Sequence, residues 1–396
     1  MNDQFEIAKA KDRKLANGKA DVNVLDRSVI RRLGKTAISK TAEPLTTVAN
    51  TTTSKAAELD NKRKSRQHVR LSIDPITVGT FLSGKLSVIE AVNGLWAQGA
   101  VPCGIETVIL LPEGTMESEL RRMEDQIAVA AMREGVSVLG GHTEVTSAVS
   151  RPVIIGSGIG TKNGLRDESR NGLRDESGNE SSNVSGNGLR NELRSELRKE
   201  YCLPTALAGF DGQVILMTSF AGLEGSAILG FEKEKELSRQ FSASLVQTAK
   251  EAADHLSVRS AAEILWRLSG ESGFSKNGIR MVNLSEGGFY AGLWKLAEKT
   301  HCGVDVDLKK VPILQETIEI ANFFDIDPYW MESAGSLLAA IPAGKAEEVL
   351  TGLAESNIPA AVIGTLNDTN QKIIRNGDEM RFLDRPQADS LRKILI

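Results

Sequence analysis

The 396-residue sequence predicts an α/β protein with α+β layers, because apolar strand-like runs alternate with amphipathic helical patterns in two separate blocks. Hydrophobic residues make up 41% and charged residues 25% of the chain, which is typical of a globular protein with a buried core. A chain of this length can also form two domains of ordinary size. We therefore expect a two-domain organisation.

The first block covers residues 68–160. Strand-like runs occupy 68–73, 104–111, 136–139 and 152–160, and helical patterns occupy 86–96 and 117–134. Asp74-Pro75, after the first run, is typical of a turn, and Thr115 is placed to cap the second helix. The third run leads directly into Gly140-Gly141, which predicts a glycine loop at the end of a strand.

The second block covers residues 202–370. Strand-like runs occupy 212–218, 303–308 and 360–364, and helical patterns occupy 241–268 and 287–300. The change of pattern between the two blocks indicates the domain boundary.

Three further segments lack a core-forming pattern: an N-terminal extension (1–67), an insertion (161–201) and a C-terminal tail (371–396). The extension has helical spacing only at 24–33, so we expect it to be poorly ordered apart from one short helix. In the insertion, NGLRDESR at 163–170 recurs with small changes at 171–178 and 187–194. Such a polar repeat favours a tolerated loop expansion.

Composition excludes several classes of function. The formal net charge of −4 argues against a nucleic acid or an anionic membrane as the main partner. No apolar run reaches the roughly 18–20 residues that a membrane span requires, and the N-terminus lacks the apolar region of a secretory signal. The three cysteines are far apart, which predicts neither a disulfide framework nor a zinc site. We expect a cytoplasmic protein.

Two glycine-containing segments are candidate anion sites. Gly140-Gly141 would let backbone N–H groups approach an anion, followed by His142, the hydroxyl of Thr143 and the carboxylate of Glu144. An ordinary strand-ending turn is the alternative, with His142 as a turn residue.

The second segment is Ser285-Glu286-Gly287-Gly288, which opens a helix and could bind an anion at the helix N-terminus. The alternative is a capping arrangement with Ser285 as the cap. Asp74 could hold Mg²⁺ through its carboxylate or form an Asx turn. No Ser-His-Asp or Cys-His arrangement can be argued, so no catalytic residue is assigned.

Five motifs in order resemble the AIR synthase related family, which groups HypE with aminoimidazole ribonucleotide synthetase, thiamine-monophosphate kinase and selenophosphate synthetase. They are IDPIT (73–77), LLPEGT (110–115), GGHTEVT (140–146), GLEGSAIL (222–229) and SEGG (285–288). The tract 312–338 also resembles the C-terminal domain of that family. The resemblance covers 69–160 and 203–366 and lies on the side of the hydrogenase maturation factor HypE.

The resemblance implies a PurM-like two-domain fold, in which the N-terminal domain forms a dimeric β-barrel with a second subunit and the C-terminal domain is an α+β sandwich. It implies ATP and Mg²⁺ between the domains, and phosphoryl transfer or dehydration of a small-molecule or protein substrate that the sequence does not identify. By position, Asp74 would bind Mg²⁺, the segment from Gly140 to Glu144 would line the phosphates, and Glu286 to Gly288 would face the nucleotide.

Several positions depart from the family pattern. Gly94 stands where relatives often carry Asp, Ser219 where Lys is expected, and Val282-Asn283 where His-Asp is expected. The acidic loop of active relatives is missing from 46–66, and the C-terminus lacks the Cys that HypE modifies. Lost carboxylates weaken a Mg²⁺ site. Two main hypotheses follow: an ATP-dependent enzyme, or a catalytically degenerate member that acts as a nucleotide-binding or regulatory dimeric scaffold. A purely structural assembly partner is a third.

Overall fold

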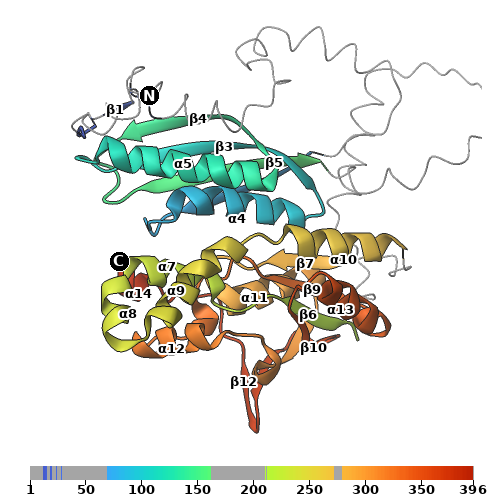
Figure 1. Cartoon of the computed structure of the whole chain (residues 1–396). Coiled ribbons are helices and arrows are strands. Elements are labelled where there is room, and N and C mark those ends of the chain that lie inside the picture. The colour runs from blue at the N-terminus through green and yellow to red at the C-terminus, as the bar shows by residue number, and fades with distance from the viewer. Residues whose placement is uncertain are drawn as a thin grey trace, which may run out of the picture.

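The computed structural model describes residues 12–15, 18–19, 24, 28, 69–161, 210, 212–271 and 279–395. Most of the predicted helix at 24–33 and nearly all of the insertion lie outside these ranges. The described residues form two layered α/β domains, which confirms the predicted fold class (Figure 1). We call 69–161 the first domain and 212–395 the second.

The first domain is one sheet with two helices on one face. Its described strands lie in the order β1-β4-β3-β5-β2. Their bounds are β1 (Gly18–Lys19), β2 (Val69–Ile76), β3 (Val101–Leu111), β4 (Ser137–Val145) and β5 (Val153–Thr161), and the helices are α4 (Ser83–Ala97) and α5 (Glu117–Glu134). The β3–β4 pair is parallel, and the other pairs are antiparallel.

Three local predictions for this domain are wrong. Asp74 and Pro75 do not form a turn but continue β2, paired with Gly156 and Ile155 of β5. An edge strand tolerates proline because one row of its N–H groups has no ladder partner. Gly140 and Gly141 likewise continue β4, because parallel pairing with β3 runs on past a register shift.

The third error concerns the start of α5, which Thr115 does not cap. The cap residue is Met116, whose backbone N–H donates to Glu119 Oε2 (2.9 Å) in a capping box. The Thr115 hydroxyl donates instead to Pro112 O (2.7 Å). Thr115 therefore stabilises the turn before the helix.

On the opposite face of this sheet, β2 carries an apolar row that no described residue covers. Val69, Leu71 and Ile73 of β2 are 58%, 61% and 65% exposed. Side chains two residues apart on a strand share a face, so these three form one apolar row.

The second domain is a sheet of seven described strands in the order β12-β11-β8-β10-β6-β9-β7. Their bounds are β6 (Val214–Thr218), β7 (Arg280–Asn283), β8 (Gly303–Asp307), β9 (Leu337–Ile341), β10 (Ala360–Asn367), β11 (Lys372–Asn376) and β12 (Glu379–Phe382). The segment predicted as a tail (371–396) thus supplies two strands, which form the hairpin projecting below the sheet in Figure 1.

Helices pack on both faces of this second sheet. The α-helices are α7 (Leu223–Glu232), α8 (Glu234–Gln240), α9 (Ala243–Glu251), α10 (Arg259–Glu271), α11 (Gly288–Thr300), α12 (Gln315–Phe323), α13 (Ala346–Glu355) and α14 (Arg392–Leu395). The 3₁₀ turns are η5 (Ala252–His255), η6 (Leu308–Lys310), η7 (Pro328–Trp330) and η8 (Ala343–Lys345). The single helix predicted at 241–268 is wrong, because η5 and an irregular stretch break it.

That break receives the buried helix α4 of the first domain. Asn93 of α4 donates from Nδ2 to Leu256 O (2.8 Å) and accepts at Oδ1 from Val258 N (3.0 Å). Val88 and Val92 of α4 also share a core with Leu265 of the second domain. The two domains are therefore joined by a continuous apolar core and one buried amide.

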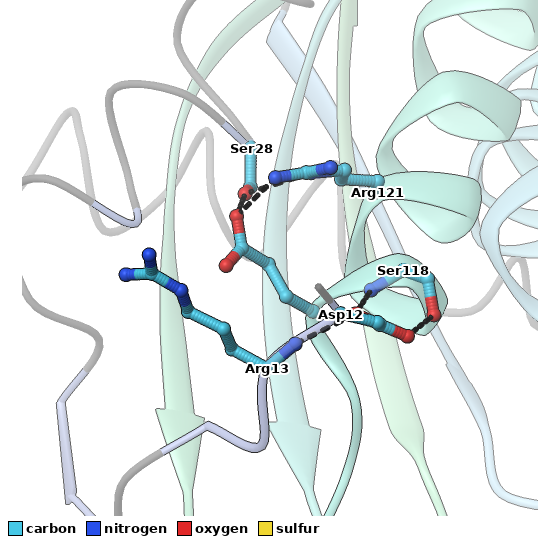
Figure 2. Close-up of polar contacts among 6 residues, drawn as sticks. Asp12, Arg13, Ser28, Ser118 and Arg121 are labelled. Atoms are coloured by element: carbon cyan, nitrogen blue, oxygen red, sulfur yellow. Dashed lines mark hydrogen bonds and ion pairs between the residues drawn. The ribbon is translucent and has the colours of Figure 1, made fainter. Parts of the chain in front are cut away.

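The described residues of the N-terminal extension pack on the first domain. Figure 2 shows Asp12 accepting from Ser118 N (3.0 Å) at the start of α5, while Ser28 Oγ donates to Glu117 Oε1 (2.8 Å). Glu117 is buried and also pairs with Arg121 (2.5 Å). These contacts satisfy the polar groups of the first helical turn. No helix in the described ranges is long and apolar enough to cross a membrane.

We expect Asn93→Ala to lower the free energy of unfolding by about 2–3 kcal/mol, because a buried carbonyl and a buried N–H lose their partner. Urea denaturation measures this value. As a control, Gln98→Ala removes a bond to Gly94 O at the end of the same helix and should cost less than about 1 kcal/mol. Equal losses for the two variants would show that Asn93 does not join the domains.

Candidate functional site

The candidate site lies where the edge strand β2 meets the start of α11. Asp74 faces away from the open apolar face of the sheet, since it alternates with Ile73, and it interacts electrostatically with Lys295 and Glu286. Burial raises the pKa of Asp74 to about 6, against the opposing effect of Lys295. The structure thus brings together two of the predicted segments, Asp74 and Ser285–Gly288.

The start of α11 is built by its two glycines. Gly287 and Gly288 have φ values of 79° and 60°, which favour glycine. A Cβ on Gly288 would also lie 2.3 Å from Met331 O. Ser285 is buried but does not cap the helix through its side chain; its backbone oxygen accepts from Gly288 N (2.9 Å). The capping alternative for Ser285 is therefore wrong.

The predicted segment Gly140–Glu144 does not join this site within one chain. β4 and β2 are separated by β3 and β5, which is three strand spacings or about 14 Å. His142 Nε2 and Glu144 Oε2 lie 3.2 Å apart, with both side chains partly exposed. Gly141 is needed for close packing, because a Cβ there would lie 2.3 Å from Thr107 O.

Four buried carboxyl groups meet beside Asp74, and the sequence did not reveal them. They are Glu90 of α4, Glu224 of α7, Glu332 before β9 and Asp389 near the C-terminus, each at most 8% exposed. In the sequence, Glu90 and Glu224 each appear as a single acidic residue within an apolar stretch, LSVIEAVNGLW and GLEGSAIL. In an amphipathic helix such a residue is expected to face the solvent, so neither was recognised as buried.

Glu90 and Glu224 come from different domains and share a hydrogen bond, which requires a proton on one of them. Burial raises the pKa of Glu224 to about 7. Burial and the neighbouring Glu224 raise the pKa of Glu90 and of Glu332 well above the ordinary value. The second carboxyl oxygen of Glu90 is buried and has no hydrogen-bond partner among the described residues.

These residues, as they stand, do not fit a Mg²⁺ ion. In the described ranges no group of three or more His, Cys, Asp or Glu side chains is placed to hold a metal. At position 94, a Cβ would lie 2.1 Å from Ser72 Oγ, so a carboxylate side chain there would require the Ser72 hydroxyl to move. Val282, at the position of the expected His, is buried in β7, whereas Asn283, at the position of the expected Asp, is half-buried.

A separate cavity of about 530 Å³ runs along α5 and η5 and shares no residue with this site. Three of its four cations form ion pairs within the chain: Lys85 (3.1 Å) and Arg133 (2.8 Å) both bind Asp254, and Arg121 binds Glu117 (2.5 Å). The fourth, Arg122, donates to Phe81 O and lies over the Phe81 ring. The buried carboxyl groups with raised pKa values therefore lie at the junction of the domains and not in this cavity.

Comparisons with known proteins agree with this two-domain architecture. Models for the N-terminal and C-terminal domains of AIR synthase related proteins match residues 57–161 and 211–375. A protein of Methanocaldococcus jannaschii named for hydrogenase expression/formation is 23% identical over 318 residues, which is 78% of each chain. Carbamoyl dehydratase HypE of Rhodobacter capsulatus is 22% identical over 273 residues, covering 68% of this chain and 65% of HypE.

Solved structures show the same fold. Hydrogenase maturation protein HypE in complex with ATP superimposes with a TM-score of 0.64 at 20% identity, covering 95% of this chain and 97% of HypE. Thiamine-monophosphate kinase from Stenotrophomonas maltophilia gives 0.53 at 15% identity, covering 80% and 88%. These similarities confirm the predicted PurM-like, HypE-like fold.

The buried carboxyl groups predict a pH-dependent stability. Because the pKa of Glu224 is raised in the folded protein, its contribution is fully present below the unfolded pKa and is lost as pH rises through about 7. We expect Glu224→Gln, which keeps a hydrogen-bonding amide, to match the wild type at pH 5 and to melt at a higher temperature at pH 8.

Calorimetric melting curves at both pH values test this expectation. Glu355→Gln, at an exposed position at the end of α13, is the matched control and should follow the wild type throughout. A Glu224→Gln variant less stable than the wild type at pH 8 would show that the carboxylate is stabilised by its surroundings after all.

Proposed function

The chain belongs to the AIR synthase related family, and from that premise we propose that it is a HypE-like, nucleotide-binding protein that works as a regulatory dimeric scaffold. In this proposal it binds ATP between its domains but does not carry out Mg²⁺-dependent phosphoryl transfer. No catalytic residue is assigned.

The observation that carries the proposal is that no group of three or more His, Cys, Asp or Glu side chains in the described ranges is placed to hold a metal, with Ser72 packed against Gly94. A carboxylate there would require Ser72 to move, since their atoms would approach to 2.1 Å. The hydroxyl of Ser72 thus lies in the space beside position 94 that a carboxylate side chain would enter. With Val282 in the core, two of the expected polar positions are filled by packing.

Nucleotide binding is supported by the ATP complex of HypE, which shares this fold over nearly its whole length. In this chain Asp74, Glu286 and the glycines that open α11 lie together at the junction of the two domains. The segment Gly140–Glu144 would contribute from the open face of the sheet, where a second subunit could bring it near a nucleotide.

Dimer formation is supported by the apolar row Val69, Leu71 and Ile73. Large apolar side chains gathered on one face of a sheet mark an interaction surface. A second copy of the same sheet would cover them and complete a barrel of the kind that the family implies. The known HypE–HypF complex suggests that a further protein partner is also open to a HypE-like chain.

An ATP-dependent enzyme is the second candidate. It is favoured by the carboxyl groups of Asp74 and Glu224, whose raised pKa values near 6 and 7 suit proton exchange at neutral pH. The substrate of such an enzyme would be a small molecule or a protein group. A cytoplasmic location suits both candidates.

Isothermal titration of ATP, with and without Mg²⁺, separates the two candidates. We expect ATP to bind whether or not Mg²⁺ is present, with no release of inorganic phosphate and with less than a twofold change in affinity for Asp74→Asn. Mg²⁺-dependent phosphate release that Asp74→Asn abolishes would establish the enzyme instead. Asp305→Asn, at an exposed ion pair on β8, is the control for the variant.

We expect the protein to sediment as a dimer and Leu71→Lys to shift it toward the monomer, because a buried charge opposes packing of the apolar face. Analytical ultracentrifugation measures the change. Phe382→Lys, an equally exposed apolar position on β12, should leave the dimer intact. A monomeric wild type would rule out the scaffold as a dimer.

A further inference from the structure

The cavity along α5 and η5 has the size of a site for a small molecule. Its volume of about 530 Å³ falls within the range of roughly 300–1,000 Å³ that is typical of ligand pockets. Its wall is formed by Phe81 and Lys85 near the start of α4, by one side of α5, and by Asp254 of η5. Residues of both domains therefore line it, and none of them belongs to the site beside Asp74.

Arg122 of α5 brings unused hydrogen-bond donors to this cavity. A guanidinium carries five N–H donors, and among the described residues Arg122 donates only to Phe81 O and pairs with no carboxylate. The guanidinium lies 4.5 Å from the centre of the Phe81 ring, and that ring stacks on Phe231 of α7 at 5.1 Å. The side chain is thus held in place in advance, which lowers the entropy cost of binding an anion.

The electrostatic field in the cavity favours an anion. Four cations and two acids line it, and two of the cations, Lys85 and Arg133, share the single carboxylate of Asp254. Hydrogen bonds from Arg133 and from Lys85 hold the pKa of Asp254 below its ordinary value, which indicates a positive surrounding. The side chains of Arg133 and Asp254 are 56% and 59% exposed. Exposed ion pairs contribute little to stability, so a bound anion can compete with Asp254.

The wall beside Arg122 is apolar. Phe81 and Val129 are each 43% exposed, and both line the cavity. The amide of Gln126, which lies between Arg122 and Val129 on the same side of α5, is already paired: its Nε2 donates to Phe81 O (2.8 Å) and its Oε1 accepts from Gly84 N (3.2 Å). A ligand that fits this wall needs an apolar body as well as an anionic group.

We propose that this cavity binds a small organic anion with an apolar body, of the class of aryl or alkyl carboxylates and sulfonates. Arg122 holds the anionic group, and Phe81 and Val129 pack against the body. The site is separate from the proposed nucleotide site and does not depend on it. Asp254 belongs to η5, part of the break that receives α4, so an anion that competes with Asp254 also acts on the contact between the domains.

The test uses the fluorescent dye anilinonaphthalene sulfonate, which joins one sulfonate to an apolar body, in titrations of the full chain. We expect Arg122→Ala to bind the dye at least about tenfold more weakly than the wild type, because a charge-assisted hydrogen bond is lost. Val129→Asp, at a partly exposed position, should weaken binding by a similar factor, because it sets a carboxylate against the dye. Arg239→Ala, at an exposed arginine of α8 outside the cavity, is the matched control and should bind like the wild type.

Two competition measurements on the wild type define the ligand class and the place. Inorganic sulfate, compared with chloride at equal ionic strength, should not displace the dye, because sulfate has no apolar body. Saturating ATP should not displace it either, because the nucleotide site shares no residue with the cavity. Displacement by sulfate or by ATP, absence of dye binding, or wild-type affinity in either cavity variant would overturn the proposal. None of these outcomes decides whether ATP binds between the domains, which the separate titration of ATP measures.

Discussion

The burial of α4 between its own sheet and the second domain is the constraint on which the rest of the molecule depends. One face of the helix fills the core of the first domain, and another joins the core beneath β6 and β9. Asn93 fixes the register, because its amide matches one carbonyl and one N–H in the break between η5 and α10. Since α4 fixes how the domains meet, it also decides which polar residues face each other across the seam.

Those residues are mostly acids, and their energetics differ from those of an ordinary ion pair. Glu90 enters from α4 and Glu224 from α7, so the hydrogen bond between them exists only while the domains are joined. Several carboxylates in one buried volume cannot all be ionised, because both burial and mutual repulsion favour the protonated forms. The contact between the domains is therefore stabilised by a protonated carboxyl group, which donates a hydrogen bond, as well as by apolar packing. In this respect it differs from a metal site, where the same acids would be ionised and bound to a cation.

The sequence predicted this architecture better than it predicted the site. The bounds of α5 agree with the predicted 117–134, because a Pro-Glu-Gly turn precedes it and Gly135 ends it in the left-handed conformation. Asp74-Pro75 and Gly140-Gly141 were misjudged because ladder pairing overrode local turn preference. The break at 252–258 and the buried Glu90 depend on a partner distant in sequence, and no local pattern carries that information.

The position of the C-terminus has a practical consequence for anyone who handles this protein. Leu391 is fully buried in an apolar cluster that includes residues of α4 and α7, and Leu395 O accepts from Arg151 Nη1 (3.3 Å). Removal of the residues from Leu391 onward would break this hydrogen bond and expose apolar side chains of that cluster to water. A shortened version of the chain, made for easier handling, would therefore be weakened at the contact between its domains.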